Sequence, residues 1–247
     1  MPVDRLAMRQ LYAPWALLLL VFSPDHVLAT TWSAGRVQDP IGSGECAVHR
    51  PMSSGSYIYH WPSKYDGVYW PYTDPHWIWF CPGSGYTSFG DDFHKLTQEE
   101  IENVRRYLQS NFRSTNTDVP IALKLKLLED IYALRNKDST FWAHFYRVLA
   151  YSNEKTPQVS LEYRRKALPL IEKRLQDLKP GFEMIQHLYL MGEYNRQLGV
   201  PQKAREYFAR AKTVQWTDKE GKVQIGSEYI NALIRDREKL MTGGEAR

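Results

Sequence analysis

The stretch GEYNRQLGVPQKAREYFARA, residues 192–211, decides the fold class of this chain. Gly199 lies near its middle, at a position where glycine typically ends a helix, and Pro201 follows where proline is tolerated at a helix start. The residues on either side are helix formers with apolar side chains at helical spacing. The stretch therefore predicts two helices joined by a short turn.

Small side chains in this stretch would let the two helices approach closely, while Phe208 would fill the space between neighbouring hairpins. The spacing is similar to that of a tetratricopeptide repeat, at Gly192, Leu198, Gly199, Ala204, Phe208 and Ala211. A weaker copy of the second helix lies 44 residues earlier, where residues 162–167 (EYRRKA) resemble residues 206–211 (EYFARA). The sequence favours a stack of tetratricopeptide-like hairpins, with an ordinary helical bundle as the alternative.

Regular breaks divide the chain after residue 96 into helices. Thr97 with Glu100 is typical of a capped helix start, and Pro157 and Pro180 lie near the starts of others. The predicted helices cover residues 97–112, 118–135, 138–152, 157–178, 180–198, 201–216 and 226–241. We therefore expect a mainly α fold, in which a tetratricopeptide-like helical hairpin stack follows a small, loop-rich β unit.

The first 29 residues have the composition of a secretory signal. Arg5 and Arg9 precede an apolar run, and Val27-Leu28-Ala29 fits a signal-peptidase site. The run has about ten residues, whereas a membrane-spanning helix needs about 20. We predict a signal peptide at residues 1–29 and an exported, periplasmic product; an N-terminal anchor or a buried helix is the alternative.

Composition divides the remainder into two parts. Residues 30–96 are rich in Gly, Pro, Ser, Tyr and Trp, and their 4 basic and 6 acidic residues give a net charge of −2. Residues 97–247 carry 26 basic and 20 acidic residues, a net charge of +6. We predict a small aromatic-rich β unit at 30–96 and a helical domain at 97–247. The whole-chain charge of +4 is too small to indicate nucleic-acid binding, and no later stretch has the length of a membrane span.

Aromatic residues concentrate in the second half of the β unit. Alternating aromatic residues around Trp61 and Trp79 predict short strands, which prolines interrupt. A unit this small lacks a core of its own, so we expect Trp77, Trp79 and Phe80 to pack it onto the helices. Trp61 and Trp70 are candidates for an exposed aromatic surface.

Two turn sequences in the β unit each hold one cysteine: CAVH at residues 46–49 and CPGSGY at residues 81–86. In a zinc ribbon, each such turn presents two ligands to one tetrahedral ion. The second candidate ligand of the first turn is His49, and that of the second turn is Ser84, a poor zinc ligand. Two thiolates and one imidazole make three zinc ligands instead of four.

The second turn and its surroundings resemble the bacterial domain-of-unknown-function family numbered 2225. The matching residues are Cys81, Pro82, Gly85, Tyr86, Phe89, Asp92 and Phe93, with Tyr65, Asp66, Tyr72 and Pro75 as matches to the middle of the family's pattern. The resemblance implies a zinc-ribbon-like part followed by tetratricopeptide-like helices, and it covers most of the chain after the signal sequence. It implies no activity.

The chain departs from this family's pattern at the cysteines. Family members that look cytosolic carry four, which implies zinc, whereas this chain has two, Cys46 and Cys81. In a folded ribbon these two sulfurs would face the same ion, so we expect that in an exported protein they form a disulfide that replaces the zinc. The alternative is a zinc site formed by Cys46, His49, Cys81 and His76.

We predict a non-enzymatic binding or assembly protein, with no catalytic residue and no cofactor. Stacked helical hairpins form concave surfaces that bind peptide segments or partner proteins. Our candidate partner-binding groove is lined by Tyr189, Asn195 and Arg196. The basic residues of the helices, Arg164 among them, predict a solvated helix face.

The alternative function is a metal-dependent or carbohydrate-active envelope enzyme centred on residues 57–94. It requires convergent side chains in one cleft, for example His60, His76, Asp91 and His94. A simpler interpretation of Asp91 and its neighbour is that they stabilise the start of the next helix through the helix dipole.

Overall fold

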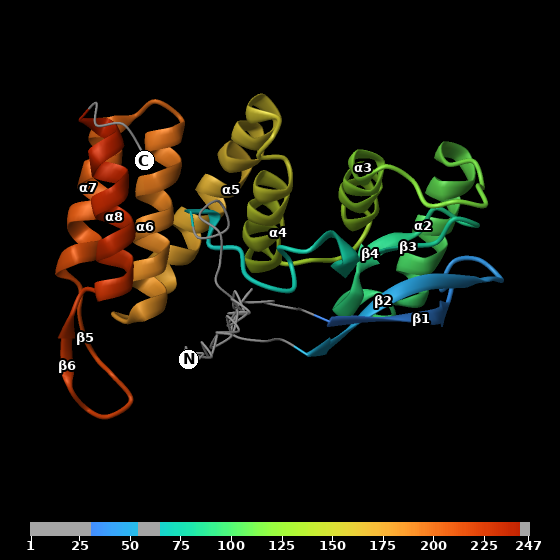
Figure 1. Ribbon diagram of the computed structural model, residues 1–247, viewed down its shortest axis with the longest axis horizontal. Helices are drawn as coiled ribbons and strands as arrows, with labels where there is room; N and C mark the ends of the chain where they lie inside the picture. Colours follow the sequence, from blue (N-terminus) through green and yellow to red (C-terminus); the bar gives the residue numbers. More distant parts are fainter. Residues whose placement is uncertain (1–30, 54–64, 243–247) are drawn as a thin grey trace, which may run out of the picture.

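The computed structural model describes residues 31–53 and 65–242, and this part of the protein is mainly helical. Figure 1 shows an elongated molecule, with β1 and β2 near one end and α7 and α8 at the other. The helices are α2 (Gln98–Asn111), α3 (Ile121–Tyr132), α4 (Ser139–Ser152), α5 (Pro157–Asp177), α6 (Phe182–Gln197), α7 (Pro201–Thr213) and α8 (Glu228–Met241). The strands and 3₁₀ helices are β1 (Thr31–Gln38), β2 (Glu45–Ser53), η1 (Pro75–Trp77), β3 (Ile78–Phe80), β4 (Thr87–Phe89), η2 (Gly90–Asp92), β5 (Gln215–Thr217) and β6 (Val223–Ile225).

The helix boundaries follow from the local sequence. The Thr97 side chain accepts a hydrogen bond from the Glu100 backbone N–H, and the Glu100 carboxylate accepts one from the Thr97 N–H. Asp138 caps α4 through its side chain, and Pro157 and Pro201 are the first residues of α5 and α7. All the helices predicted from the sequence are confirmed within the part of the chain that the structure describes.

The strands of the described residues form three separate antiparallel pairs. The longest pair joins β1 to β2 and places Val37 opposite Cys46, while β3 pairs with β4. Trp79 lies in β3 as the alternation predicts, whereas the segment around Trp61 lies outside the described residues. The β structure before residue 97 is therefore small and built from hairpins.

The helix predicted over residues 201–216 ends earlier, at Thr213, because the chain turns into the β5–β6 hairpin. Asp218 organises the turn by accepting hydrogen bonds from the Glu220 and Lys222 backbone N–H groups. The hairpin, which we did not predict, projects beside the ends of α7 and α8 (Figure 1).

The short strands share their core with the helices. Trp79 and Phe80 are 8% and 4% exposed, and they belong to one apolar cluster with Val104 and Leu108 of α2. Phe89 of β4 packs in a second cluster with residues of α3 and α4. The packing of Trp79 and Phe80 onto the helices is thus confirmed, because strands of three residues cannot enclose a core alone.

Helix α6 is the centre of the C-terminal half, where it packs against α5, α7 and α8. Gly192 of α6 faces Phe208 of α7 so closely that a Cβ atom at Gly192 would collide with the ring. Ala204 and Ala211 of α7 are fully buried as well. Small side chains therefore permit the close approach of α6 and α7, as the sequence predicts.

The substitution Gly192→Ala distinguishes the effect of this close packing on stability from the effect of helix propensity. Alanine favours a helix over glycine by about 1 kcal/mol, so the change would stabilise α6 if the space were open. We expect instead a loss of about 1–3 kcal/mol in the free energy of unfolding, measured by chemical denaturation, because the core is overpacked. Gly83→Ala is the control, since no atom lies within 4 Å of the position that its Cβ would take. A Gly192→Ala protein as stable as the wild type would contradict the close contact.

Candidate functional site

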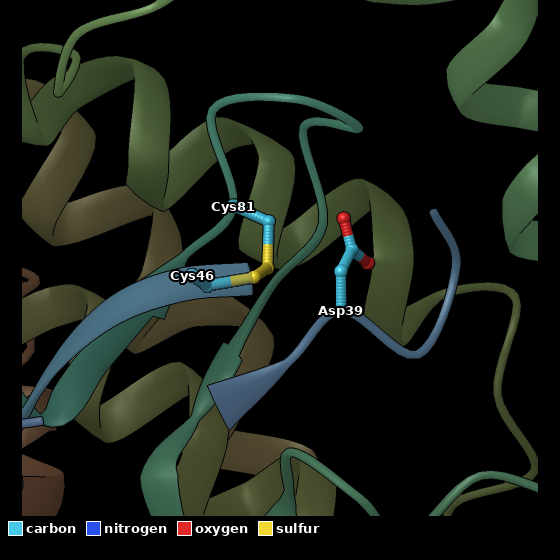
Figure 2. A group of neighbouring side chains, drawn as sticks. All are labelled: Asp39, Cys46 and Cys81. Carbon is cyan, nitrogen blue, oxygen red and sulfur yellow. A yellow bond between two sulfur atoms is a disulfide. The ribbon is translucent and has the colours of Figure 1, made fainter. Parts of the chain in front are cut away.

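Cys46 and Cys81 lie at disulfide distance and join the two N-terminal hairpins. Cys46 lies in β2, Cys81 directly follows β3, and their Cα atoms are 4.8 Å apart, a separation typical of disulfides. Figure 2 shows the linked sulfur atoms between the two segments. Each residue is 1% exposed. The pairing is the one hypothesised from the sequence.

A tight turn follows Cys81. The Gly85 N–H donates to the Cys81 carbonyl oxygen at 2.7 Å, and the Cys81 N–H donates to the Tyr86 carbonyl oxygen at 2.9 Å. Gly85 has a φ of +83°, and the Phe112 ring occupies the space that a Cβ would need. The Ser84 hydroxyl accepts a hydrogen bond from the Tyr86 N–H at 3.1 Å, so this side chain stabilises the turn.

The four residues of the alternative zinc site do not converge. Cys46 is buried while His49, three residues further along β2, is exposed, so the two side chains leave opposite faces of the strand. Among the described residues, the group that could hold a metal ion is Asp39, Cys46 and Cys81, with ligand atoms within 4.8 Å of one another (Figure 2). Two of these three atoms are the paired sulfurs, and a disulfide offers no thiolate to zinc.

His49 meets His76 instead, at a cavity of about 510 Å³. Their ring centres are 4.5 Å apart in an edge-to-face arrangement. Nδ1 of His76 lies 2.8 Å from Oδ1 of Asp74, and the Trp32 indole N–H donates to the other Asp74 oxygen at 2.9 Å. Parts of β2, η1, β3 and α3 line this cavity, and Lys124 of α3 is among the lining residues.

A buried ion pair joins the loop before η1 to α5. Nε and Nη2 of Arg164 donate to the two carboxylate oxygens of Asp66 at 2.9 and 2.7 Å. Burial raises the pKa of the Asp66 carboxyl, and the Arg164 charge opposes that shift. Arg147 of α4 donates to the backbone carbonyl oxygens of Asp66 and Gly67. Charged groups from two helices thus hold one turn of this loop.

The solvated face predicted for Arg164 is wrong, since this residue is 8% exposed. Arg164 lies on the same buried face of α5 as Ser160, Ala167 and Ile171. The burial of Arg164 could have been predicted from this helical spacing, because the spacing places the arginine among core positions. A buried arginine needs a carboxylate partner, which Asp66 supplies from a distant part of the chain.

The network continues into a cleft of about 430 Å³ between α5, α6 and α8. Arg164, Arg196 and Arg237 line this arginine cleft together with Glu193 and Tyr65. Arg196 donates to the Glu193 carboxylate at 2.8 Å, and Arg237 packs over the Tyr65 ring and donates to its hydroxyl. Nε of the buried Arg237 has no hydrogen-bond acceptor among the described residues.

The predicted partner-binding groove is corrected at two of its three positions. Tyr189 is 1% and Asn195 is 4% exposed, and the Asn195 amide donates to the Met191 carbonyl oxygen one turn earlier. Because α5, α7 and α8 all pack on α6, a residue that seemed to face a groove lies in the core instead. Arg196 is half-buried and lines the arginine cleft.

The aromatic surface candidates have different outcomes. Trp61 lies outside the described residues. Trp70 is half-buried, with its ring centre 6.2 Å from that of Trp32.

The enzyme alternative takes His60, His76, Asp91 and His94 as an example of convergent side chains. His60 lies outside the described residues, and no candidate metal-holding group within them contains His76, Asp91 or His94. Asp91 accepts a hydrogen bond from a tyrosine hydroxyl at 2.9 Å, and Asp92 forms ion pairs with two basic residues that follow α3. Asp91 and Asp92 thus interact with specific side chains, which the helix-dipole interpretation did not predict.

These features define a mainly helical protein in which two cysteine-linked β hairpins pack against helices that enclose a charged cleft. A family model described as "Uncharacterized protein conserved in bacteria (DUF2225)" matches residues 62–240, and the chain belongs to this family, which confirms the resemblance. Neither the curated proteins nor the solved structures gave a match. Within residues 31–53 and 65–242, no helix is both long and apolar enough to cross a membrane.

The cysteine pair gives a prediction for thiol content and stability. A cross-link between residues 35 apart in sequence stabilises a protein by about 3–4 kcal/mol in the chain-entropy model. We expect no reactive thiol in protein denatured without reductant, and a loss of that size in the double variant Cys46→Ser/Cys81→Ser. Two titratable thiols per chain in protein isolated under oxidising conditions would contradict the pairing.

The Asp66–Arg164 pair gives a second prediction. Asp66→Asn leaves the Arg164 guanidinium buried without its counter-charge, which costs about 3–5 kcal/mol of unfolding free energy. Arg164→Met should cost a similar amount, and the double variant should cost clearly less than the sum, as a denaturation cycle measures. Arg165→Ala, at an exposed position of the same helix, is the control and should change stability by at most about 0.5 kcal/mol. Additive effects would mean that the two charges do not interact.

Proposed function

We propose that this protein is an exported, non-enzymatic binding or assembly protein that holds protein or peptide segments on its helical hairpins. The observation that carries this proposal is the arginine cleft between α5, α6 and α8. It is a concave site formed by helices from different hairpins, and such surfaces are where helical-repeat proteins bind extended partners.

Three arginines and two glutamates line the cleft, and its arginines favour a partner segment that carries carboxylates. Asp66, which does not line the cleft, forms an ion pair with Arg164, and Glu193 forms one with Arg196. Arg237 lies 3.9 Å from the same Glu193 carboxylate, so two arginines share one counter-charge. Arg196 is half-buried, whereas Arg164 and Arg237 are each 8% exposed. Guanidinium groups bind carboxylates with two parallel hydrogen bonds, which makes them selective for acidic side chains or a chain terminus.

The finer architecture is part of the proposal. Consecutive helices α4 and α5, and α6 and α7, pack against each other, and the Gly192–Phe208 contact supports tetratricopeptide-like packing within the α6–α7 hairpin. One cysteine from each N-terminal hairpin supports descent from a zinc ribbon whose ion was replaced by a disulfide. Such a disulfide persists in an oxidising compartment. Together with the composition of residues 1–29, it supports a cleaved signal peptide and a periplasmic location.

Site-specific photo-crosslinking in intact cells tests the binding role. A crosslinking side chain at Leu161, a half-buried residue of the cleft wall, should give a covalent adduct of defined mass with a protein of the cell envelope. When the reaction is run in isolated envelopes, the yield of this adduct should fall as the salt concentration is raised, because salt screens the attraction of a charged partner. Mass spectrometry of the adduct should place the attached segment next to Asp, Glu or a chain terminus.

The matched control is the same crosslinker at Lys203, an exposed position of α7 outside the cleft. It should give no adduct of that mass. Equal adducts at both positions, or none at Leu161, would count against the cleft as a binding site.

A further inference from the structure

The His49–His76 pair lies apart from both the arginine cleft and the cysteine pair. The backbone of each histidine is anchored to the β unit. The His49 carbonyl oxygen accepts a hydrogen bond from the Trp79 indole at 3.0 Å, and the His76 N–H donates to Asp74 at 2.9 Å. Both side chains are exposed. The two imidazoles therefore meet on a supported surface at the edge of the cavity.

Asp74 fixes the orientation of the His76 ring. The 2.8 Å contact between Asp74 Oδ1 and Nδ1 places the ring proton on Nδ1 and leaves Nε2 as the ligating atom. Asp74 is itself held, because the Trp32 indole N–H donates to Oδ2 at 2.9 Å. Metal-binding histidines in proteins commonly donate their second ring N–H to a carboxylate, and His76 already has this partner.

The spacing of the rings fits a shared ion. Metal–nitrogen bonds of about 2.0–2.1 Å place each ring centre about 3.2 Å from the metal, so two neighbouring imidazole ligands have ring centres roughly 4.5–5 Å apart. The ring centres of His49 and His76 are 4.5 Å apart, at an interplanar angle of 63°. The separation of the ring centres is therefore the one expected for two imidazoles that share an ion.

We propose that His49 and His76 bind one divalent transition-metal ion through their imidazoles, with Asp74 positioning His76. Two protein ligands leave the remaining coordination positions open toward the cavity of about 510 Å³, where water or a small ligand can complete them. Imidazole suits Zn²⁺, Ni²⁺ and Cu²⁺, and the general order of affinities makes Cu²⁺ the tightest of these. The site is independent of the paired sulfurs of Cys46 and Cys81.

Titration of tag-free, oxidised protein with Cu²⁺ at neutral pH tests this site. Calorimetry should give saturable binding at this site, and electron paramagnetic resonance should report two coordinating ring nitrogens. His49→Ala and His76→Ala should each remove one nitrogen and weaken binding at least about tenfold. Asp74→Asn should keep both nitrogens and weaken binding by about 10–100-fold, the range measured for such supporting carboxylates.

His94→Ala is the matched control, because His94 is an exposed histidine of the same β unit. It should retain the affinity and both nitrogens, and circular dichroism should verify that every variant is folded. The site is overturned if no saturable Cu²⁺ binding occurs, if both His49→Ala and His76→Ala bind like the wild type, or if His94→Ala causes an equal loss.

Discussion

The buried ion pair between Asp66 and Arg164 fixes the segment that ties the two halves of the molecule together. Residues 65–72 run from the C-terminal helices toward β3, and Figure 1 shows this part of the chain passing alongside α4 and α5. Its first residue, Tyr65, packs under Arg237 of α8, while Val68 is fully buried with residues of α3 and α4. A buried carboxylate at this position is costly without its cationic partner. The segment is therefore most stable where Asp66 contacts Arg164.

This constraint links the two candidate sites. Arg164 contacts Asp66 on one side and lines the arginine cleft on the other, so the cleft depends on the same loop that leads into η1 and β3. At the far end, the cysteine pair holds β2 against the residue after β3, and His49 of β2 meets His76 of η1, which directly precedes β3. The β unit, which lacks a core of its own, is thus held together by the cysteine pair and is tied to the helices by the ion pair and the shared apolar clusters.

Local signals predicted the helices, because caps, prolines and helical spacing act within a few residues, as at Thr97 and Pro201. The family pattern, together with the predicted export, led to the prediction that Cys46 and Cys81 pair. The sequence did not predict the burial of Arg164 or of Tyr189, since both depend on which helices pack on α5 and α6. The β5–β6 hairpin was missed because three-residue strands carry too little alternation to compete with the preceding helical pattern. The sequence analysis grouped His49 and His76 with the cysteines because it took residues 46–49 as a turn. These residues lie in β2, where side chains alternate between faces, so Cys46 and His49 point to opposite sides.

The central claim is that the ion pair makes the β unit and the helices one cooperative unit. Native-state hydrogen exchange measures this directly, because each amide reports the free energy of the opening that exposes it. The account predicts that amides of β3 and α6 exchange through openings of equal free energy, and that Asp66→Asn lowers both together. Exchange in β3 at a much lower free energy than in α6, with α6 unchanged by Asp66→Asn, would contradict it.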